Sequence, residues 1–207
     1  RKKYFDGKFL IHTTNNIKET KHDICLLLGK SLDDLNKSEN WDGGRVFLKQ
    51  NLPAVDGWKT REQIFYILNE TVNYVVIRDC DVAPYLPIRP NTCSYYYDVE
   101  ILTDDIQSLR YTLQPKTSQN NEFAFGIFLD VDGKEQPFHY KFLGDRYFDI
   151  NIERKLLESR KLNQNNVYIV GNDELYFYTL LYHSIIHKEN YKKYNEIFSK
   201  LAKKLKI

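Results

Sequence analysis

The stretch Tyr97-Asp98-Val99-Glu100-Ile101-Leu102 places two acidic residues within an apolar run. In a β-strand, residues two apart point to the same face, so Asp98 and Glu100 project together while Val99 and Ile101 enter the core. Two carboxylates on one face repel each other unless a positive group lies between them. A Mg²⁺ ion satisfies this need, because hard cations take carboxylate oxygens and also bind substrate phosphates. A solvent-facing strand with ordinary alternation explains the same pattern.

The segments around this run alternate between helix and strand patterns. Thr60, with Gln63 three residues later, is a capping-box pattern that opens a helix, and the β-branched run at 74–77 is typical of a buried strand. A further helix is expected at 105–113. The Asp-Gly pair within residues 130–134 indicates a hairpin turn.

The full pattern predicts an α+β domain, with a small mixed β-sheet and a layer of helices on one side. The expected elements are a strand at 8–12, helices at 16–28 and from 60, strands at 74–77 and 95–102, a helix at 105–113, strands at 123–129 and 136–142, and helices at 149–160, at 173–188 and from near Tyr191. We expect residues 1–57 to form an N-terminal extension packed on the core. Residues 58–207 should form that core with its C-terminal helices, and the whole chain is interpreted as one compact unit.

Composition limits the class of protein. Of the 207 residues, 42% are hydrophobic and 28% are charged, which fits a folded chain and not a disordered one. Apolar runs such as 24–28 are far shorter than the roughly 20 residues of a membrane span, and no signal-like leader is evident. Three separated cysteines favour a reducing compartment, so we expect a cytoplasmic location without a membrane span. The net charge of +2 is too balanced to predict nucleic acid as the main partner.

Several stretches together resemble the DNA polymerase β-like nucleotidyltransferase superfamily, and within it an uncharacterised branch associated with surface-polysaccharide gene clusters. The resemblance covers residues 60–195, and its matching stretches are Ile67-Leu68-Asn69, Tyr74-Val75-Val76-Ile77-Arg78, Asp98-Val99-Glu100-Ile101-Leu102, Gly144-Asp145-Arg146-Tyr147-Phe148-Asp149 and residues 180–188. It implies a nucleotidyltransferase-like fold. It also implies a metal-dependent transferase that moves a nucleotidyl or phosphoryl-linked group from a nucleotide donor to the hydroxyl of a carbohydrate or alditol, in surface glycan biosynthesis.

In the mechanism that we expect, individual residues have distinct roles. Asp98 and Glu100 would hold the Mg²⁺, and Arg78 would neutralise charge that develops on the transferred group, which makes these three the expected catalytic residues. Lys141 is a second cation suited to a phosphate.

Two positions depart from the superfamily pattern. Its members carry a Gly-Gly or Gly-Ser turn after the first strand, where this chain has Arg78-Asp79. A third carboxylate is expected on a later strand, where this chain has His139. Asp130, Asp132 or Asp145 would then have to substitute, and Asp145 is also an expected substrate-binding residue.

A rival metal site is Asp79-Cys80-Asp81. Many glycosyltransferases with a nucleotide-sugar-binding fold use an Asp-x-Asp motif after an apolar strand to hold Mn²⁺ and the donor diphosphate. Asp79 and Asp81 would then be the metal ligands and a nucleotide-sugar the donor. Against this interpretation, the first 50 residues contain no convincing βαβ unit of the kind that binds the nucleoside.

The C-terminal part offers further candidates for binding. His183 and His187 lie four apart on an expected helix, so they face the same way, as zinc ligands or as residues of a packed or polar face. With Lys188 beside them, they could contact a phosphate instead. Residues 188–207 are rich in lysine, which fits a solvated face or a nucleic-acid contact. A catalytically silent module that binds nucleotides or glycans also stays open.

Overall fold

The computed structural model describes residues 14–36, 52–78, 99–114, 126–187 and 194–207. The chain divides into two compact units, residues 1–53 and 54–207, whereas the expected boundary lies after residue 57. The strand expected at 8–12 lies outside the described residues, and the packing of the extension on the core stays a prediction.

The first unit contains α2 (Ile17–Leu28) and α3 (Leu32–Asn36). The side chain of Asn16 caps α2 by accepting a hydrogen bond from the backbone N–H of Glu19. Gly29 ends the helix in the left-handed conformation, with φ at 62°. The sequence prediction for this helix is therefore confirmed, since an amide side chain at the start and a glycine at the end are the usual helix signals.

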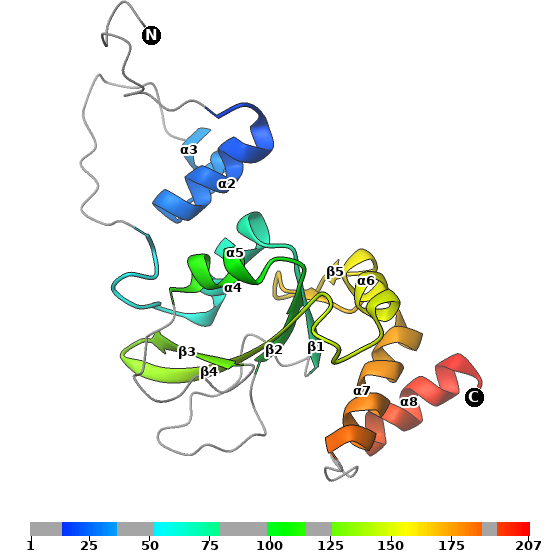
Figure 1. Cartoon of the computed structure of the whole chain (residues 1–207). Coiled ribbons are helices and arrows are strands. Elements are labelled where there is room, and N and C mark those ends of the chain that lie inside the picture. Colours follow the sequence, from blue (N-terminus) through cyan, green and yellow to red (C-terminus); the bar gives the residue numbers. More distant parts are fainter. Residues whose placement is uncertain (1–13, 37–51, 79–98, 115–125, 188–193) are drawn as a thin grey trace, which may run out of the picture. The chain divides into compact units, whose positions relative to one another are not determined.

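The second unit folds as a mixed α+β structure, as expected from the order of its patterns (Figure 1). Its elements, in chain order, are α4 (Arg61–Thr71), β1 (Tyr74–Arg78), β2 (Val99–Thr103), α5 (Ile106–Leu113), β3 (Gly126–Val131), β4 (Lys134–Phe142), α6 (Ile150–Glu158), β5 (Lys161–Leu162), β6 (Tyr168–Ile169), α7 (Asp173–His187) and α8 (Asn195–Leu205). The short strands β5 and β6 were not expected. None of the helices in the described part of the chain is long and apolar enough to cross a membrane.

The six strands form one open sheet in the order β3-β4-β2-β1-β6-β5. β1 and β2 are antiparallel, whereas β2 and β4 are parallel, so the sheet is mixed as predicted. The β3–β4 hairpin turns at Asp132 and Gly133, which both have positive φ. This geometry is that of a two-residue turn, for which Asp-Gly is a preferred sequence.

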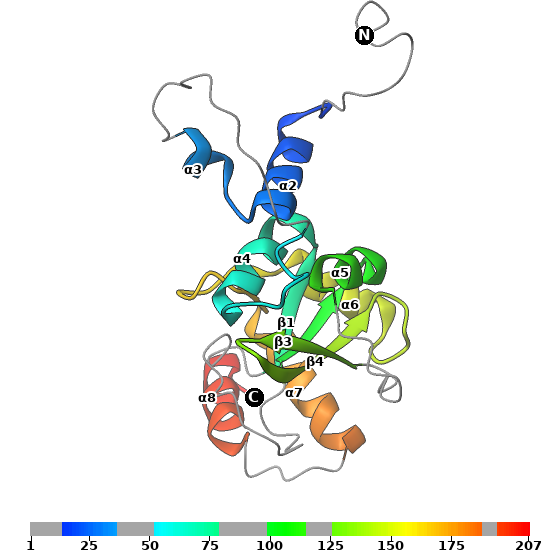
Figure 2. The same ribbon diagram turned by 90° about the vertical axis from the view of Figure 1, so that its left-hand side faces the viewer.

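Helices pack against both faces of the sheet, which corrects the expected single layer (Figure 2). On one face, Phe65 of α4 contacts the rings of Tyr74 and Phe138. On the other face, Val75 of β1 and Leu156 of α6 belong to a cluster against which residues of α7 also pack. The physical reason is that β1 and β2 are buried along both faces, and such strands need a cover on each side.

Candidate functional site

A polar cluster lies on the face of the sheet that α6 and α7 cover. We call it the Glu100 cluster, and its members are Arg78 at the end of β1, Glu100 on β2, Lys141 on β4, Tyr147 between β4 and α6, and His183 on α7. Glu100, Lys141 and His183 are buried. The side chain of Arg78 is 16% exposed, against 4% for that of Glu100, so the guanidinium is more accessible from solvent than the carboxylate.

The backbone of β1 turns Arg78 toward this face. Val76 pairs with Ile101 in the antiparallel ladder, but Arg78, and not Ile77, lies opposite Glu100. This shift of one residue is a β-bulge, and bulges redirect the side chains that follow them. On the other side of β2, Lys141 pairs with Leu102 and therefore points to the same face as Glu100.

The helix α7 brings His183 to the same place. The hydroxyl of Thr179 donates a hydrogen bond of 3.3 Å to the carbonyl of Ile77, the residue at the bulge. Thr179 and His183 are four apart on the helix and so lie on one face. The contact at Ile77 therefore sets His183 above Arg78, the next residue of the strand.

Hydrogen bonds and ion pairs connect the cluster from end to end. The Nε of Arg78 donates to Oε2 of Glu100, and Nζ of Lys141 lies 3.8 Å from Oε1 of the same carboxylate. The Nη1 of Arg78 bonds to Nε2 of His183, whose Nδ1 lies 3.1 Å from the hydroxyl oxygen of Tyr147. The ammonium of Lys141 also lies 4.1 Å from the centre of the Tyr147 ring.

The electrostatics of the two cations differ. Burial is the largest single effect on Arg78 and lowers its pKa, but the attraction of Glu100, the hydrogen bond to it, and the nearby Tyr194 and Tyr147 together outweigh burial, so the pKa lies above its ordinary value. For Lys141, burial is the larger effect, and it lowers the pKa despite the attraction of Glu100 and Asp145. Burial and the charge of Glu100 raise the pKa of Tyr147, which therefore keeps its proton at neutral pH. Arg78 is accordingly the permanent positive charge of the cluster.

Two carboxyl groups hold the loop that carries Tyr147. The Oδ1 of Asp145 accepts a hydrogen bond of 2.8 Å from the backbone N–H of Tyr147, and its Oδ2 accepts one of 3.2 Å from that of Phe142. The Oε2 of Glu153, on α6, accepts a bond of 2.7 Å from the N–H of Gly144. Asp145, expected to bind substrate, therefore has its oxygens engaged with the backbone of its own loop.

The structure brings four of the expected site residues together. They are Arg78, Glu100, Lys141 and His183. Asp145 lies in the loop that carries Tyr147, with its oxygens bonded to the backbone. The remaining expected residues lie outside what the structure describes: Asp79, Asp81, Asp98 and Lys188, together with the side chain of His187.

The position of the expected third carboxylate is filled by His139, which pairs with Glu100 across β2 and β4. Asp130 pairs with Glu135, four residues before His139 on β4, which is about 13 Å along the strand. Asp132 lies further away, in the hairpin turn. Neither aspartate therefore stands in for a carboxylate beside Glu100.

The described residues do not fit a divalent metal at Glu100. Both oxygens of this carboxylate already face a cation, Arg78 on one side and Lys141 on the other, and a metal ion would be repelled by both. Among the residues that the structure describes, no group of three or more His, Cys, Asp or Glu could hold a metal ion. Binding of Mg²⁺ or Mn²⁺ stays a prediction that rests on Asp98 and on the Asp79–Asp81 pair, which lie outside the described residues.

A groove of about 570 Å³ lies between α6 and the first half of α7. It is lined by Ile152 and Lys155 of α6, and by Leu175 and Tyr178 of α7, among others. The ring of Tyr178 lies 5.9 Å from that of Tyr182, which in turn lies 5.6 Å from the ring of Tyr147. A row of tyrosines thus runs from the groove to the Glu100 cluster.

Two aromatic residues of the site were not found from the sequence. Tyr147 lies within residues 144–149, a stretch that already carries part of the resemblance, so its neighbour Asp145 could have drawn attention to it. Tyr194, just before α8, is buried with its ring edge-on to that of His183, 6.4 Å away. Nothing in the local sequence marks it, because it meets His183 only through the packing of α8 on α7.

The chain was compared with models of protein families, with curated proteins and with solved structures, and none of the three comparisons gave a match. The residues of the Glu100 cluster and the groove beside it are therefore the features from which a function can be inferred.

Proposed function

We propose that the unit formed by residues 54–207 is a transferase that binds the phosphate groups of a nucleotide donor at the Glu100 cluster. In this proposal it moves a nucleotidyl or phosphoryl-linked group to a hydroxyl acceptor, in surface glycan biosynthesis. The observation that carries the proposal is the state of Arg78: a partly exposed guanidinium held by the buried Glu100 and by His183. A fixed guanidinium matches the geometry of phosphate oxygens and is a common phosphate ligand.

The arrangement of the strands supports this proposal. The resemblance assigns the site to the end of the first strand, to the acidic strand and to a later strand, which here correspond to β1, β2 and β4. These three strands are neighbours in the sheet, and each contributes one member of the cluster: Arg78, Glu100 and Lys141. Positive groups at such a place would stabilise the negative charge of a transferred phosphoryl group.

We assign the acceptor to the groove between α6 and α7. The ring of Tyr178 offers an apolar face on which a sugar can stack, and Asn172, Glu174 and Lys155 line the same groove with polar groups. The tyrosine row, with ring centres 5.9 Å and 5.6 Å apart, leads from the groove through Tyr182 to Tyr147 of the cluster. The acceptor class, a carbohydrate or an alditol, comes from the resemblance.

The test is a thermal-shift screen of the full chain with nucleoside triphosphates, CDP-alcohols, and UDP- or GDP-sugars. Each ligand is measured with Mg²⁺, with Mn²⁺ and with EDTA, so that the need for a metal is decided in the same experiment. A ligand at 100 times its dissociation constant should stabilise the protein by about 2.7 kcal/mol. The proposal expects a clear shift with triphosphates or CDP-alcohols.

Two matched variants locate the binding site. Arg78→Lys keeps the charge but loses the fork of N–H donors, so it should abolish most of the shift. Arg160→Lys is the control, since Arg160 donates to the carbonyl of Tyr74 and stacks on Tyr168, away from the cluster. Equal shifts in the two variants would contradict a donor site at Arg78.

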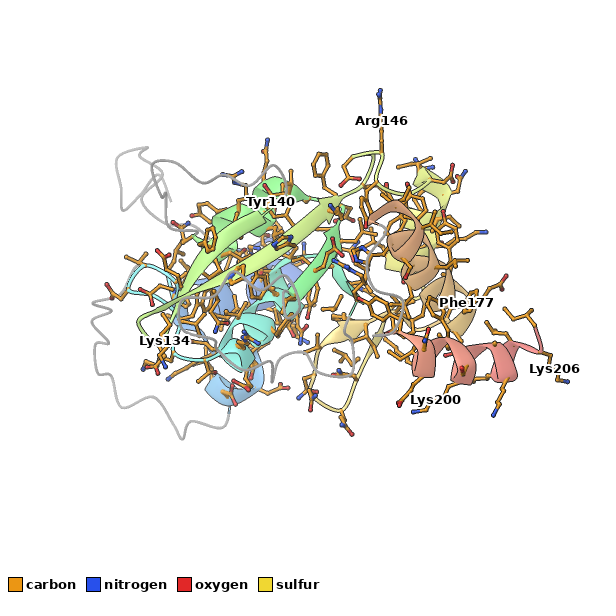
Figure 3. The ribbon with its side chains drawn as sticks, turned by 90° about the horizontal axis from the view of Figure 1, so that it is seen from below. Lys134, Tyr140, Arg146, Phe177, Lys200 and Lys206 are labelled. Carbon is orange, nitrogen blue, oxygen red and sulfur yellow. The ribbon has the colours of Figure 1, made fainter. Side chains whose placement is uncertain are left out.

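The same screen addresses the competing functions. A shift confined to nucleotide-sugars and dependent on Mn²⁺ would favour a glycosyltransferase that uses Asp79 and Asp81. Binding without any transfer to an added acceptor would favour a catalytically silent module. For the lysine-rich C-terminal segment, with Lys200 on α8 and Lys206 just after its end (Figure 3), a nucleic-acid role would require an affinity that falls steeply with salt.

A further inference from the structure

The hydrogen bond between Arg78 and His183 fixes the proton on the imidazole. A guanidinium has only N–H donors, so Nε2 of His183 must accept the bond from Nη1 of Arg78 and must carry no proton. A neutral imidazole has one proton, which then lies on Nδ1. This Nδ1–H points at the hydroxyl oxygen of Tyr147, 3.1 Å away, which can accept it. These two contacts together fit one state of His183, neutral and protonated on Nδ1.

We propose that His183 is a positioning residue, which in this neutral form holds the guanidinium of Arg78 against Glu100 so that the remaining N–H groups of Arg78 are presented to a phosphate. This inference rests on the proposed function and changes the role of His183, which the sequence suggested as a direct ligand of the substrate. His183 instead acts through Arg78, and Tyr147 fixes the orientation of its ring.

The geometry around Arg78 supports this division of roles. Its Nε is committed to Glu100 and one N–H of Nη1 to His183, while a guanidinium offers five N–H donors in all. Only 4% of the surface of His183 is exposed, so a ligand reaches Arg78 more readily than it reaches the imidazole. The two anchors prevent rotation of the guanidinium, which lowers the entropy lost when it binds a ligand.

Within the part of the chain that the structure describes, groups from several segments surround His183, directly or through one intermediate. They are Arg78 of β1, Glu100 of β2 through its bond to Arg78, Lys141 of β4 through its contact with Tyr147, Tyr147 itself, and Tyr194 before α8. A proton on Nε2 would face the N–H groups of Arg78 directly. It would replace an attraction by the repulsion of two like charges, and so release Arg78 from its anchored position.

The first test needs no ligand and no variant of uncertain stability. Nitrogen-15 NMR of the imidazole side chains distinguishes the two neutral tautomers and the protonated ring. At pH 7.5 we expect His183, assigned by the loss of its signal in His183→Gln, to be neutral with its proton on Nδ1. A proton on Nε2, or a protonated ring, would overturn the proposal.

The second test uses two substitutions of different length. The amide oxygen of Gln reaches the position of Nε2, whereas that of Asn reaches only the position of Nδ1. Binding of inorganic pyrophosphate is measured by calorimetry at pH 7.5, without metal, for His183→Gln, His183→Asn and the wild type. His183→Gln should bind within about threefold of the wild type, and His183→Asn about tenfold or more weakly, because only Gln supplies the acceptor for Arg78.

The pH dependence of pyrophosphate affinity distinguishes a positioning role of His183 from a purely structural one, because only the positioning role depends on an unprotonated Nε2. The ratio of wild-type to His183→Gln affinity cancels the titration of pyrophosphate itself. It should fall in acid, once a proton on Nε2 removes the acceptor that Arg78 needs. A constant ratio, or equal losses in the Gln and Asn variants, would overturn the positioning role. If the wild type binds neither pyrophosphate nor any nucleotide, the proposed function fails, and the NMR result still decides the state of His183.

Discussion

Arg78 lies directly opposite Glu100 in the β1–β2 ladder because a bulge at Ile77 shifts the register by one residue. Without the bulge, Ile77 would face Glu100, and Arg78 would point to the other face of the sheet. The ion pair of Arg78 and Glu100, and the contact of Arg78 with His183, therefore depend on one extra residue in β1.

Removal of the shared carboxylate should destabilise the protein strongly. In Glu100→Ala, Arg78 and Lys141 lose their common partner while they remain largely buried, which typically costs about 3–5 kcal/mol. Chemical denaturation measures the loss. Lys204→Ala, which breaks the exposed contact with Asp173, is the control and should change the unfolding free energy little. Similar small decreases of the unfolding free energy in both variants would mean that the ion pairs of Glu100 contribute little to the stability of the fold.

Replacement of the three charged residues Arg78, Glu100 and Lys141 should abolish ligand binding while the protein remains folded. In the triple variant Arg78→Met, Glu100→Leu, Lys141→Met, no charge is left without a partner, and apolar groups of similar size fill the space. Such replacements are often neutral or stabilising. We expect a folded protein within about 2 kcal/mol of the wild type that no longer binds nucleotides or pyrophosphate. A variant that retains binding would place the donor site elsewhere.

Much of the fold could be predicted from the sequence because its signals are local. Asn16, Thr60 and Asp105 each accept a hydrogen bond from the first turn of the helix that follows, as their side chains suggest. The Asp132-Gly133 turn likewise depends on two adjacent residues. Strands β5 and β6 were missed because two residues each are too few for a periodic pattern.

The site was harder to predict, since its contacts join residues distant in the sequence. The alternation of Val99, Glu100 and Ile101 correctly indicated that the two apolar side chains enter the core and that Glu100 points to the opposite face of the sheet. It did not indicate that Glu100 is itself buried, with 3% of its surface exposed. Nothing in the β1 sequence reveals the bulge that turns Arg78 toward it. The contact of His183 with Arg78 spans 105 positions and depends on how α7 packs on β1.

The carboxyl group of Glu153 should make stability depend on pH. Burial raises its pKa above the ordinary 4.5, and the nearby Asp145 adds to the effect, while the hydrogen bond from Gly144 opposes it. The folded protein thus binds this proton more tightly than the unfolded chain does. The contribution to stability is fully present below pH 4.5 and is lost as the pH rises through the folded pKa.

Glu153→Gln should remove this dependence, since its amide oxygen still accepts the bond from Gly144 but cannot ionise. Its unfolding free energy, relative to that of the wild type, should increase as the pH rises from 4.5 toward neutral. Glu153→Ala is the comparison: it leaves two backbone N–H groups, those of Gly144 and Phe148, without their acceptor and should lose about 1–3 kcal/mol below pH 4.5, a loss that shrinks as the pH rises because alanine does not ionise either. Parallel curves for the Gln variant and the wild type would contradict the raised pKa.

Two glycines should respond to substitution for opposite reasons. Gly133 has φ at 71°, and a Cβ there would meet nothing within 4 Å, so Gly133→Ala should cost about 1–2 kcal/mol through backbone strain alone. At Gly171, before α7, a Cβ would collide with the backbone carbonyl oxygen of Ser159, beyond the end of α6. The backbone at Ser159 has to move, so Gly171→Ala should cost about 1–3 kcal/mol through steric overlap.

Asparagine distinguishes the two causes, because it tolerates the left-handed conformation better than alanine but is larger. Gly133→Asn should therefore recover part of the stability that Gly133→Ala loses, whereas Gly171→Asn should be no more stable than Gly171→Ala. Thermal unfolding of the four variants measures both differences. A recovery at Gly171 would show that the backbone there is strained instead of crowded. In that case the close approach of Gly171 to the carbonyl of Ser159 would not be the reason why a glycine is needed at this position.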